Sequence, residues 1–197
     1  MNSLNKKLVL AFLLILMFGS FGFFVIDRAS KSRINNIGII GQVSPFSLTN
    51  FDGSIINEKQ LNDKISIISF IFTQCDGACP IMSDNMSVLQ ERFSSSEDIQ
   101  FFSITTDPEF DTLNVLSDFS SKYSNKDNWF FLRGDIADIV NLSEKGFFLS
   151  AALLPVGHST RFVLVDKNSN IRKYYEGTVE SNIYELQSDI VTLLNQE

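Results

Sequence analysis

The sequence contains one histidine and only two cysteines in 197 residues, which restricts the chemistry open to it. A single histidine excludes the HExxH motif of zinc proteases and any catalytic zinc site that requires several histidines. The chain has no glycine-rich phosphate-binding loop, so it carries no nucleotide-site signature. Composition leaves a Cys–His–Asn/Asp protease arrangement open, but such a nucleophile needs no second cysteine four residues away.

Positive charge is scarce outside the N-terminal region. The whole chain has 16 Lys and Arg against 23 Asp and Glu. Residues 1–33 hold five of the basic residues and one acidic residue, so the remainder has 11 basic and 22 acidic residues and a net charge of −11. We expect no nucleic-acid partner and no binding to anionic lipid surfaces by this acidic part.

The N-terminal region contains the one long uncharged run, Leu8–Ile26. Nineteen helical residues at ~1.5 Å each match the thickness of a bilayer core. Lys6 and Lys7 also suit a signal peptide, but the run exceeds the usual ~7–15 residues and no small-x-small cleavage site follows it. We predict a tail at 1–7, a transmembrane anchor at 8–26, a tether at 27–42 and a folded domain at 43–197.

The remaining chain alternates strand and helix patterns. An N-terminal hairpin is predicted around the Asn50–Gly53 turn, and Ile65–Phe72 has the composition of a central strand buried on both faces. Met82, Met86, Leu89 and Phe93 define one face of a helix that begins near Pro80. Further strands are expected at 99–104, 129–132, 161–166 and 171–176, with helices at 113–123 (capped by Asp111), 135–147 and 179–194. This order predicts an α/β, thioredoxin-like three-layer sandwich with an N-terminal β-hairpin extension, preceded by one transmembrane helix.

Cys75 and Cys79 lie just beyond the predicted central strand, where sites form in open α/β sheets. Their spacing places both sulfurs on one side of a helical turn, and a helix N-terminus favours thiolates. Three interpretations stay open at this point. They are a structural disulfide, which gains little from closing so short a loop, a redox-active dithiol, and a soft metal site for copper or zinc.

The lone histidine, His158, lies in a loop just before the predicted strand at 161–166. A lone histidine is more often an ordinary residue than a ligand, but this position can face the cysteine loop. Met82 and Met86 are soft donors whose helical spacing assigns them to the core. Asp107 follows the strand at 99–104 and is interpreted as a turn residue or hydrogen-bond acceptor near the site.

Several motifs in order carry a family resemblance. They are Phe46–Thr49 with Asp52-Gly53, Phe70–Pro80 with its Cys-x-x-x-Cys-Pro loop, Ser103–Thr112, Trp129–Gly134 and His158-Ser159. Over about residues 44–196 the chain resembles the Sco/SenC family of membrane-anchored, thioredoxin-like copper proteins. It departs from the family pattern in the cysteine loop, where Gln74 stands in the place of the usual histidine and Asp76-Gly77 follows the first cysteine, where the family commonly has proline. It also has one extra residue between Ser103 and Asp107, and it lacks the acidic residue that often precedes the histidine corresponding to His158.

The resemblance implies that Cys75, Cys79 and His158 bind one copper ion, as Cu(I) or Cu(II). It implies a metallochaperone that delivers copper to cytochrome c oxidase subunit II, or reduces that subunit's cysteines, with an upstream copper donor or thiol reductant as a second partner. The lack of an Arg-rich presequence favours a bacterial inner membrane, with a single-pass anchor and the domain facing the periplasm.

Two enzymatic alternatives stay open beside this expectation. In a thiol–disulfide oxidoreductase without obligatory metal, Cys75 would attack and Cys79 would resolve. A peroxiredoxin-like peroxidase is suggested by Thr73 shortly before Cys75, but the upstream proline spacing is missing, so we rank it last.

Overall fold

The structure is a computed structural model that describes residues 12–26, 28, 37–124 and 127–195. It divides into two units, residues 1–37 and 38–197, which are considered separately. In the first unit, residues 12–26 are helical. None of the helices in the described ranges is long and apolar enough to cross a membrane. Outside those ranges lie the predicted tail at 1–7, the first residues of the predicted anchor at 8–26 and most of the predicted tether at 27–42.

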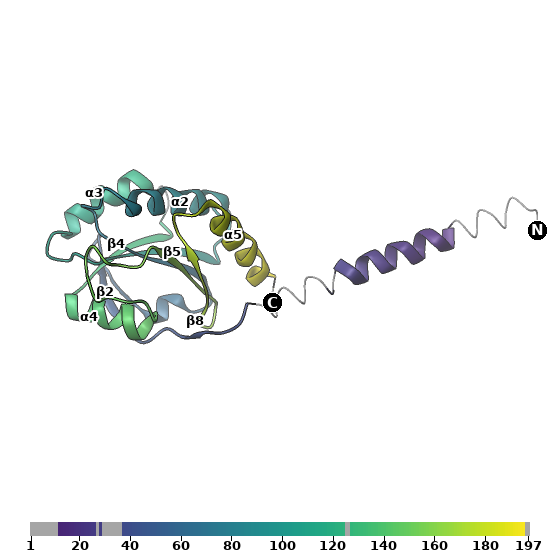
Figure 1. The fold of residues 1–197 in the computed structure, drawn as a ribbon, viewed down its shortest axis with the longest axis horizontal. Coiled ribbons are helices and arrows are strands. Elements are labelled where there is room, and N and C mark those ends of the chain that lie inside the picture. Colours follow the sequence, from purple (N-terminus) through teal and green to yellow (C-terminus); the bar gives the residue numbers. More distant parts are fainter. Residues whose placement is uncertain (1–11, 27, 29–36, 125–126, 196–197) are drawn as a thin grey trace, which may run out of the picture. The chain divides into compact units, whose positions relative to one another are not determined.

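The described part of the second unit is built on an eight-stranded sheet (Figure 1). Its strand order is β1-β8-β7-β4-β5-β6-β2-β3. The central strands β4, β5 and β6 are parallel, and every other neighbouring pair is antiparallel. The strands are β1 (Gly41–Gln42), β2 (Ser47–Asn50), β3 (Ile55–Asn57), β4 (Ile65–Ile71), β5 (Ile99–Thr105), β6 (Trp129–Arg133), β7 (Arg161–Val165) and β8 (Asn170–Glu176).

Helices cover both faces of the sheet and make three layers. α2 (Ala78–Arg92), α3 (Leu113–Tyr123) and α5 (Glu180–Leu194) share one hydrophobic cluster with the sheet. The 3₁₀ helix η1 (Glu58–Leu61), α4 (Ile136–Asn141) and the π-helix η2 (Leu142–Gly146) supply Leu61, Ile139 and Leu142 to the cluster on the other face. Figure 1 shows α2 and α3 on one side of the strands and α4 on the opposite side.

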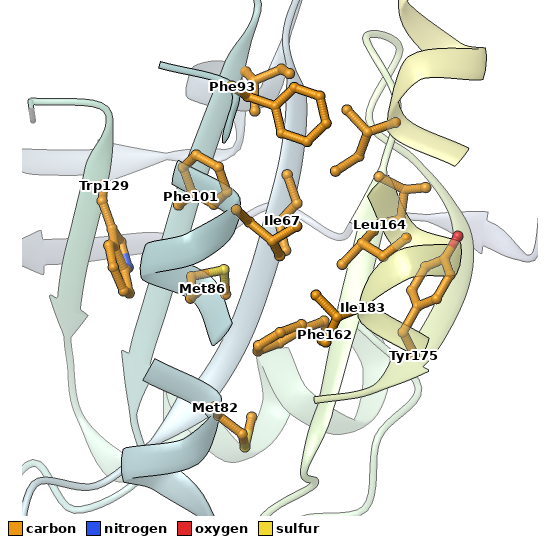
Figure 2. Close-up of a cluster of buried hydrophobic side chains, with 14 of the residues drawn as sticks. Ile67, Met82, Met86, Phe93, Phe101, Trp129, Phe162, Leu164, Tyr175 and Ile183 are labelled. Carbon is orange, nitrogen blue, oxygen red and sulfur yellow. The ribbon is translucent and has the colours of Figure 1, made fainter. Parts of the chain in front are cut away.

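Strand β4 explains why the sheet has two cores. All seven of its residues are buried, as its continuous apolar sequence predicts. Because successive side chains point to opposite faces, Ile65 and Ile67 join the α2 side while Ile68 and Phe70 join the α4 side. Figure 2 shows the α2-side cluster, in which Met82 and Met86 of the helix lie among side chains from the strands. The α/β thioredoxin-like arrangement predicted from the sequence is confirmed.

The N-terminal hairpin also forms as predicted. β2 pairs with β3, and β2 then pairs antiparallel with β6, so the hairpin extends one edge of the sheet. The helix expected near Pro80 begins two residues earlier, at Ala78, and Pro80 lies in its first turn, where no N–H is needed. Strand β1 is an element that the sequence did not predict, because two residues carry no periodicity; it lies within the predicted tether and pairs with β8.

The prediction that Asp111 caps the helix at 113–123 is wrong. Thr112 is the N-cap of α3, and its hydroxyl accepts a hydrogen bond from the Val115 N–H at 3.4 Å. Asp111 is instead fully buried, and its carboxylate accepts hydrogen bonds from elsewhere in the fold. The sequence rule finds both residue types suitable as caps, so only the tertiary structure decides between adjacent candidates.

Candidate functional site

The cysteine loop joins the end of β4 to the start of α2. The Cys75 N–H donates to the Phe72 carbonyl at 3.3 Å, which turns the chain immediately after the strand. Gly77 is the N-cap of α2, so Cys79 is the second residue of that helix. Cys75 is partly exposed and Cys79 is fully buried, and both are free thiols.

The sheet brings His158 to the same place. β7 runs antiparallel to β4, so the loop before β7 lies at the edge of the sheet where β4 ends. His158 Nε2 lies 3.2 Å from Cys79 Sγ, although the two residues are 79 positions apart in the sequence. The sequence placed His158 near the cysteine loop only as an expectation, and this part of the expectation is confirmed.

The orientation of the imidazole follows from its other contacts. Nδ1 lies 3.0 Å from the Ser159 carbonyl oxygen, which can only accept, so Nδ1 carries the proton. Nε2 therefore has a free lone pair directed at Cys79, and the Cys79 thiol donates to it. The Phe72 ring meets the imidazole edge-on, with ring centroids 5.5 Å apart. Burial lowers the pKa of His158, although the bond to Ser159 opposes this effect, so the ring is neutral at neutral pH.

The two thiols have opposite pKa shifts. Burial alone would raise the pKa of Cys75, but the backbone N–H groups of Cys79, Gly77 and Ala78, together with the Cys79 thiol, bring it below its usual value. Burial, the neighbouring Cys75 and the charge of Asp111 raise the pKa of Cys79 to about 12, against the opposing Phe72 N–H. The helix N-terminus thus stabilises a thiolate at Cys75, while Cys79 is a neutral thiol at neutral pH.

The predicted ligand set is only partly assembled. The structure brings Cys79 and His158 into contact, and Cys75 interacts with the Cys79 thiol. Within the described ranges, no group of three or more His, Cys, Asp or Glu side chains is gathered as a metal site. The three-residue copper site therefore stays a prediction. Met82 and Met86 are buried in the core cluster, where their spacing had placed them.

One residue that the sequence did not single out connects the two loops of the site. Thr106 follows β5, and its N–H and hydroxyl both donate to the Ile71 carbonyl, at 2.7 and 3.1 Å. The same hydroxyl lies 3.4 Å from the Pro155 carbonyl, which also accepts from the His158 N–H at 3.4 Å. Thr106 thus links the end of β4 to the histidine loop. Its sequence signal was its place inside the Ser103–Thr112 motif, beside Asp107 at the end of a strand.

Comparison with known proteins places these features in a family. The family model described as SCO1/SenC matches residues 40–195. The SCO1 protein homolog of Bacillus subtilis is 29% identical over 156 residues, which cover 76% of this chain and 81% of that protein. The crystal structure of a SCO1/SenC family lipoprotein from Bacillus anthracis is 30% identical, with a TM-score of 0.73, and the match covers 79% of this chain and 96% of that one.

A second solved structure is described by a redox property. The structure of BsSco, described as a member of the Sco family of cytochrome c oxidase assembly proteins with a disulfide switch, is 28% identical with a TM-score of 0.72. The match covers 81% of this chain and 98% of that chain. The residues matched by the SCO1/SenC family model, 40–195, include the whole cysteine loop and the histidine loop.

Proposed function

The chain belongs to the SCO1/SenC family, and on that premise we propose that it is a membrane-held copper-binding protein of cytochrome c oxidase assembly. In this role it delivers copper to the dinuclear copper site of oxidase subunit II, or reduces the cysteines of that site. An upstream donor supplies the copper, and a thiol reductant supplies the electrons for reduction. The observation that best supports the proposal is the 3.2 Å contact between Cys79 Sγ and His158 Nε2, with the Cys75 thiol beside it.

The chemistry of the donor set fits copper. Two thiols and one imidazole are soft and borderline donors, which suit Cu(I) and Cu(II). His158 presents the lone pair of Nε2 because its Nδ1–H is used by the Ser159 carbonyl. Cys75, Cys79 and His158 would hold the ion, and a bound ion would supply the positive charge that displaces the thiol protons.

The surroundings suit a cargo that must be held and then released. Cys79 is fully buried and the Phe72 ring packs against the imidazole, so water has little access to this half of the site. Cys75 is partly exposed, which leaves one donor accessible to the thiolates of a partner. Exchange between thiolates through an accessible sulfur is the step that copper transfer requires.

The test is copper stoichiometry and affinity in the reduced full-length protein, kept in detergent. We expect one copper per chain for the wild type and a large loss of Cu(II) retention for His158→Ala, because the imidazole donor is removed. Met82→Leu is the matched control, since it removes a sulfur that lies in the core close to the site. Equal Cu(II) retention by His158→Ala and the wild type would contradict the three-ligand site.

A thiol–disulfide oxidoreductase is the second candidate, and the unequal exposure of the cysteines favours it. The Cys75 thiolate would attack a partner disulfide, form a mixed disulfide and release one partner thiolate. Cys79, after losing its proton, would then attack Cys75 Sγ, release the second partner thiolate and leave a Cys75–Cys79 disulfide. Reductase activity that survives complete copper chelation and His158→Ala would favour this candidate over the copper carrier.

We also propose that residues 8–26 anchor the chain in a bacterial inner membrane, with the domain on the periplasmic side. The uncharged composition of this run supports the proposal, and residues 12–26 are helical. Membrane fractions washed with carbonate should retain the full chain, and deletion of residues 1–26 should release it. External protease should cleave the domain in spheroplasts but not in intact cells, and protection in spheroplasts would contradict this orientation.

A further inference from the structure

Asp111 is a buried acidic residue that neither proposed mechanism uses. It is 0% exposed and lies in the segment that connects β5 to α3. The cap position that its sequence suggested is occupied by Thr112. A carboxylate in such a position is costly unless donors surround it, so its partners indicate what it does.

The donors to Asp111 come from the ends of two neighbouring strands. The Thr73 N–H lies 3.2 Å from Oδ2 and 3.4 Å from Oδ1, and the Thr73 hydroxyl donates to Oδ1. The Thr105 hydroxyl donates to Oδ2. Thr105 is the last residue of β5, and Thr73 lies two residues beyond the end of β4. The carboxylate therefore joins the two strand ends through three donors.

Thr73 is well placed to pass this constraint to the site. Only Gln74 separates it from Cys75, and the Cys75 N–H bonds to the carbonyl of Phe72, the residue before Thr73. Phe72 is also the residue whose ring packs against the imidazole of His158. A shift of Thr73 would therefore move the Cys75 turn relative to the Cys79–His158 pair, because the histidine is also held through the Ser159 and Pro155 carbonyls. Hydrogen bonds to an ionised acceptor are shorter and stronger than neutral ones, so Asp111 suits this fixing role better than an amide or hydroxyl.

We propose that Asp111 is a positioning residue, which sets the placement of Cys75 relative to the Cys79–His158 pair by holding Thr73 against the end of β5. The inference rests on the proposed copper site, but it also applies to the metal-free dithiol. Loss of the carboxylate loosens the loop, so the thiols and the imidazole meet less often in the arrangement that copper needs. Residues that orient metal ligands typically change metal affinity by about 10- to 100-fold when they are replaced.

The main variant is Asp111→Asn in the full-length protein, since asparagine keeps the shape and offers one accepting oxygen in place of two. Cu(I) affinity is measured by competition with a chromophoric chelator, and we expect it to fall by about 10- to 100-fold. Thr73→Val removes one hydroxyl donor and should show a smaller fall, while Thr73→Ser keeps the hydroxyl and should restore affinity. Urea unfolding reports the stability of each variant.

Asp189→Asn is the matched control. Asp189 is also buried, and it accepts from the Tyr175 hydroxyl at 2.7 Å and from Lys173 at 3.0 Å, in contacts between β8 and α5. The Asp189→Asn variant should lose stability without any change in copper affinity. If Asp111→Asn loses affinity only in proportion to stability, as the control does, then Asp111 has a purely structural role and the inference is overturned.

A second measurement separates this inference from the proposed function. The equilibrium of the Cys75–Cys79 dithiol with dithiothreitol is measured without metal. Asp111→Asn should shift it by about tenfold or more, Thr73→Val, which leaves the Asp111 charge in place, should shift it less but in the same direction, and Asp189→Asn should not shift it. If the wild type binds no copper but the first two variants shift the equilibrium, the copper role fails and the positioning role stands. If the wild type binds copper through His158 and Asp111→Asn matches it within twofold in both measurements, the positioning role fails alone.

Discussion

Thr106→Val tests the connection between the end of β4 and the histidine loop. Valine keeps the shape and the backbone bond from residue 106 to the Ile71 carbonyl, but it removes the hydroxyl that donates to Ile71 and Pro155. The bond to Ile71 has ordinary geometry and the one to Pro155 is long, so the loss counts as one to two neutral hydrogen bonds. At about 1 kcal/mol for each, the free energy of unfolding should fall by about 1–2 kcal/mol. For a domain of this size, that corresponds to a fall in Tm of about 2–8 °C.

The Thr106→Val variant should lose more copper affinity than its lower stability alone would cause. The Pro155 carbonyl also accepts from the His158 N–H, so the freed loop carries the imidazole with it. We expect Cu(I) affinity to fall by about tenfold, at the lower end of the range for residues that orient ligands. Unfolding is followed by the fluorescence of Trp129, the single tryptophan in the sequence, and affinity by chelator competition.

Thr192→Val is the control for this variant. Its hydroxyl donates to the Ser188 carbonyl at 2.9 Å within α5, so the same chemical change occurs away from the site. Thr106→Ser keeps the hydroxyl and should behave as the wild type. The reasoning is refuted if Thr106→Val keeps full stability, or if its copper affinity equals that of Thr192→Val.

Three further predictions concern the thiols, a buried tyrosine and one glycine. In the reduced, metal-free protein at pH 7, iodoacetamide should modify Cys75 at least about a thousandfold faster than Cys79, because Cys79 is fully buried and its pKa of about 12 leaves almost no thiolate. Peptide mass spectrometry of a time course measures the ratio of the two rates. Equal rates would contradict the environments assigned to the two thiols. Tyr175→Phe should lower the free energy of unfolding by about 1.5–3 kcal/mol, because the Tyr175 hydroxyl is a buried donor to the Asp189 carboxylate at 2.7 Å. Urea titration measures this change, and an unchanged unfolding midpoint would mean that the hydrogen bond contributes nothing to stability. Gly177→Ala should destabilise the fold by about 1–3 kcal/mol, because an added Cβ would lie 2.8 Å from the Thr160 carbonyl oxygen. Thermal unfolding measures this change, and wild-type stability would show that the backbone moves apart at this contact without cost.

The sequence predicts the central elements well because their patterns are physically distinct. A strand buried on both faces must be apolar throughout, and Ile65–Phe72 is nearly so, whereas a helix that covers a sheet must be apolar at intervals of three and four, as from Met82 to Phe93. Once β4 and its helix are assigned, the place of the cysteines at the end of the strand follows. The two-residue strand β1 offers no such pattern, and it depends on pairing with β8, which is far away in the sequence.

The supports of the site were not predictable by these means. Asp111 and Thr112 are both good caps in local terms, and only the burial of one of them separates their roles. Thr105 and Thr106 are adjacent residues of similar type, yet one hydroxyl turns to Asp111 and the other to the Ile71 and Pro155 carbonyls. Alternation along the strand end explains this division, because successive side chains point to opposite faces. Their partners, however, are set by long-range contacts that a local pattern does not encode.

The division between the two threonines bears on how a site can both hold and release a cargo. Thr106 supports the histidine loop, which belongs to the buried half of the site with Cys79. Thr105 acts through Asp111 and Thr73 on the side of Cys75, the partly exposed half. Each half therefore has its own support on the same strand end. Asp111→Asn acts on Cys75 and Thr106→Val acts on His158, so the metal-free dithiol equilibrium should shift strongly in the first variant and weakly in the second. Equal responses to both variants would show that the site moves as one unit, and that the exposed cysteine has no independent freedom for exchange.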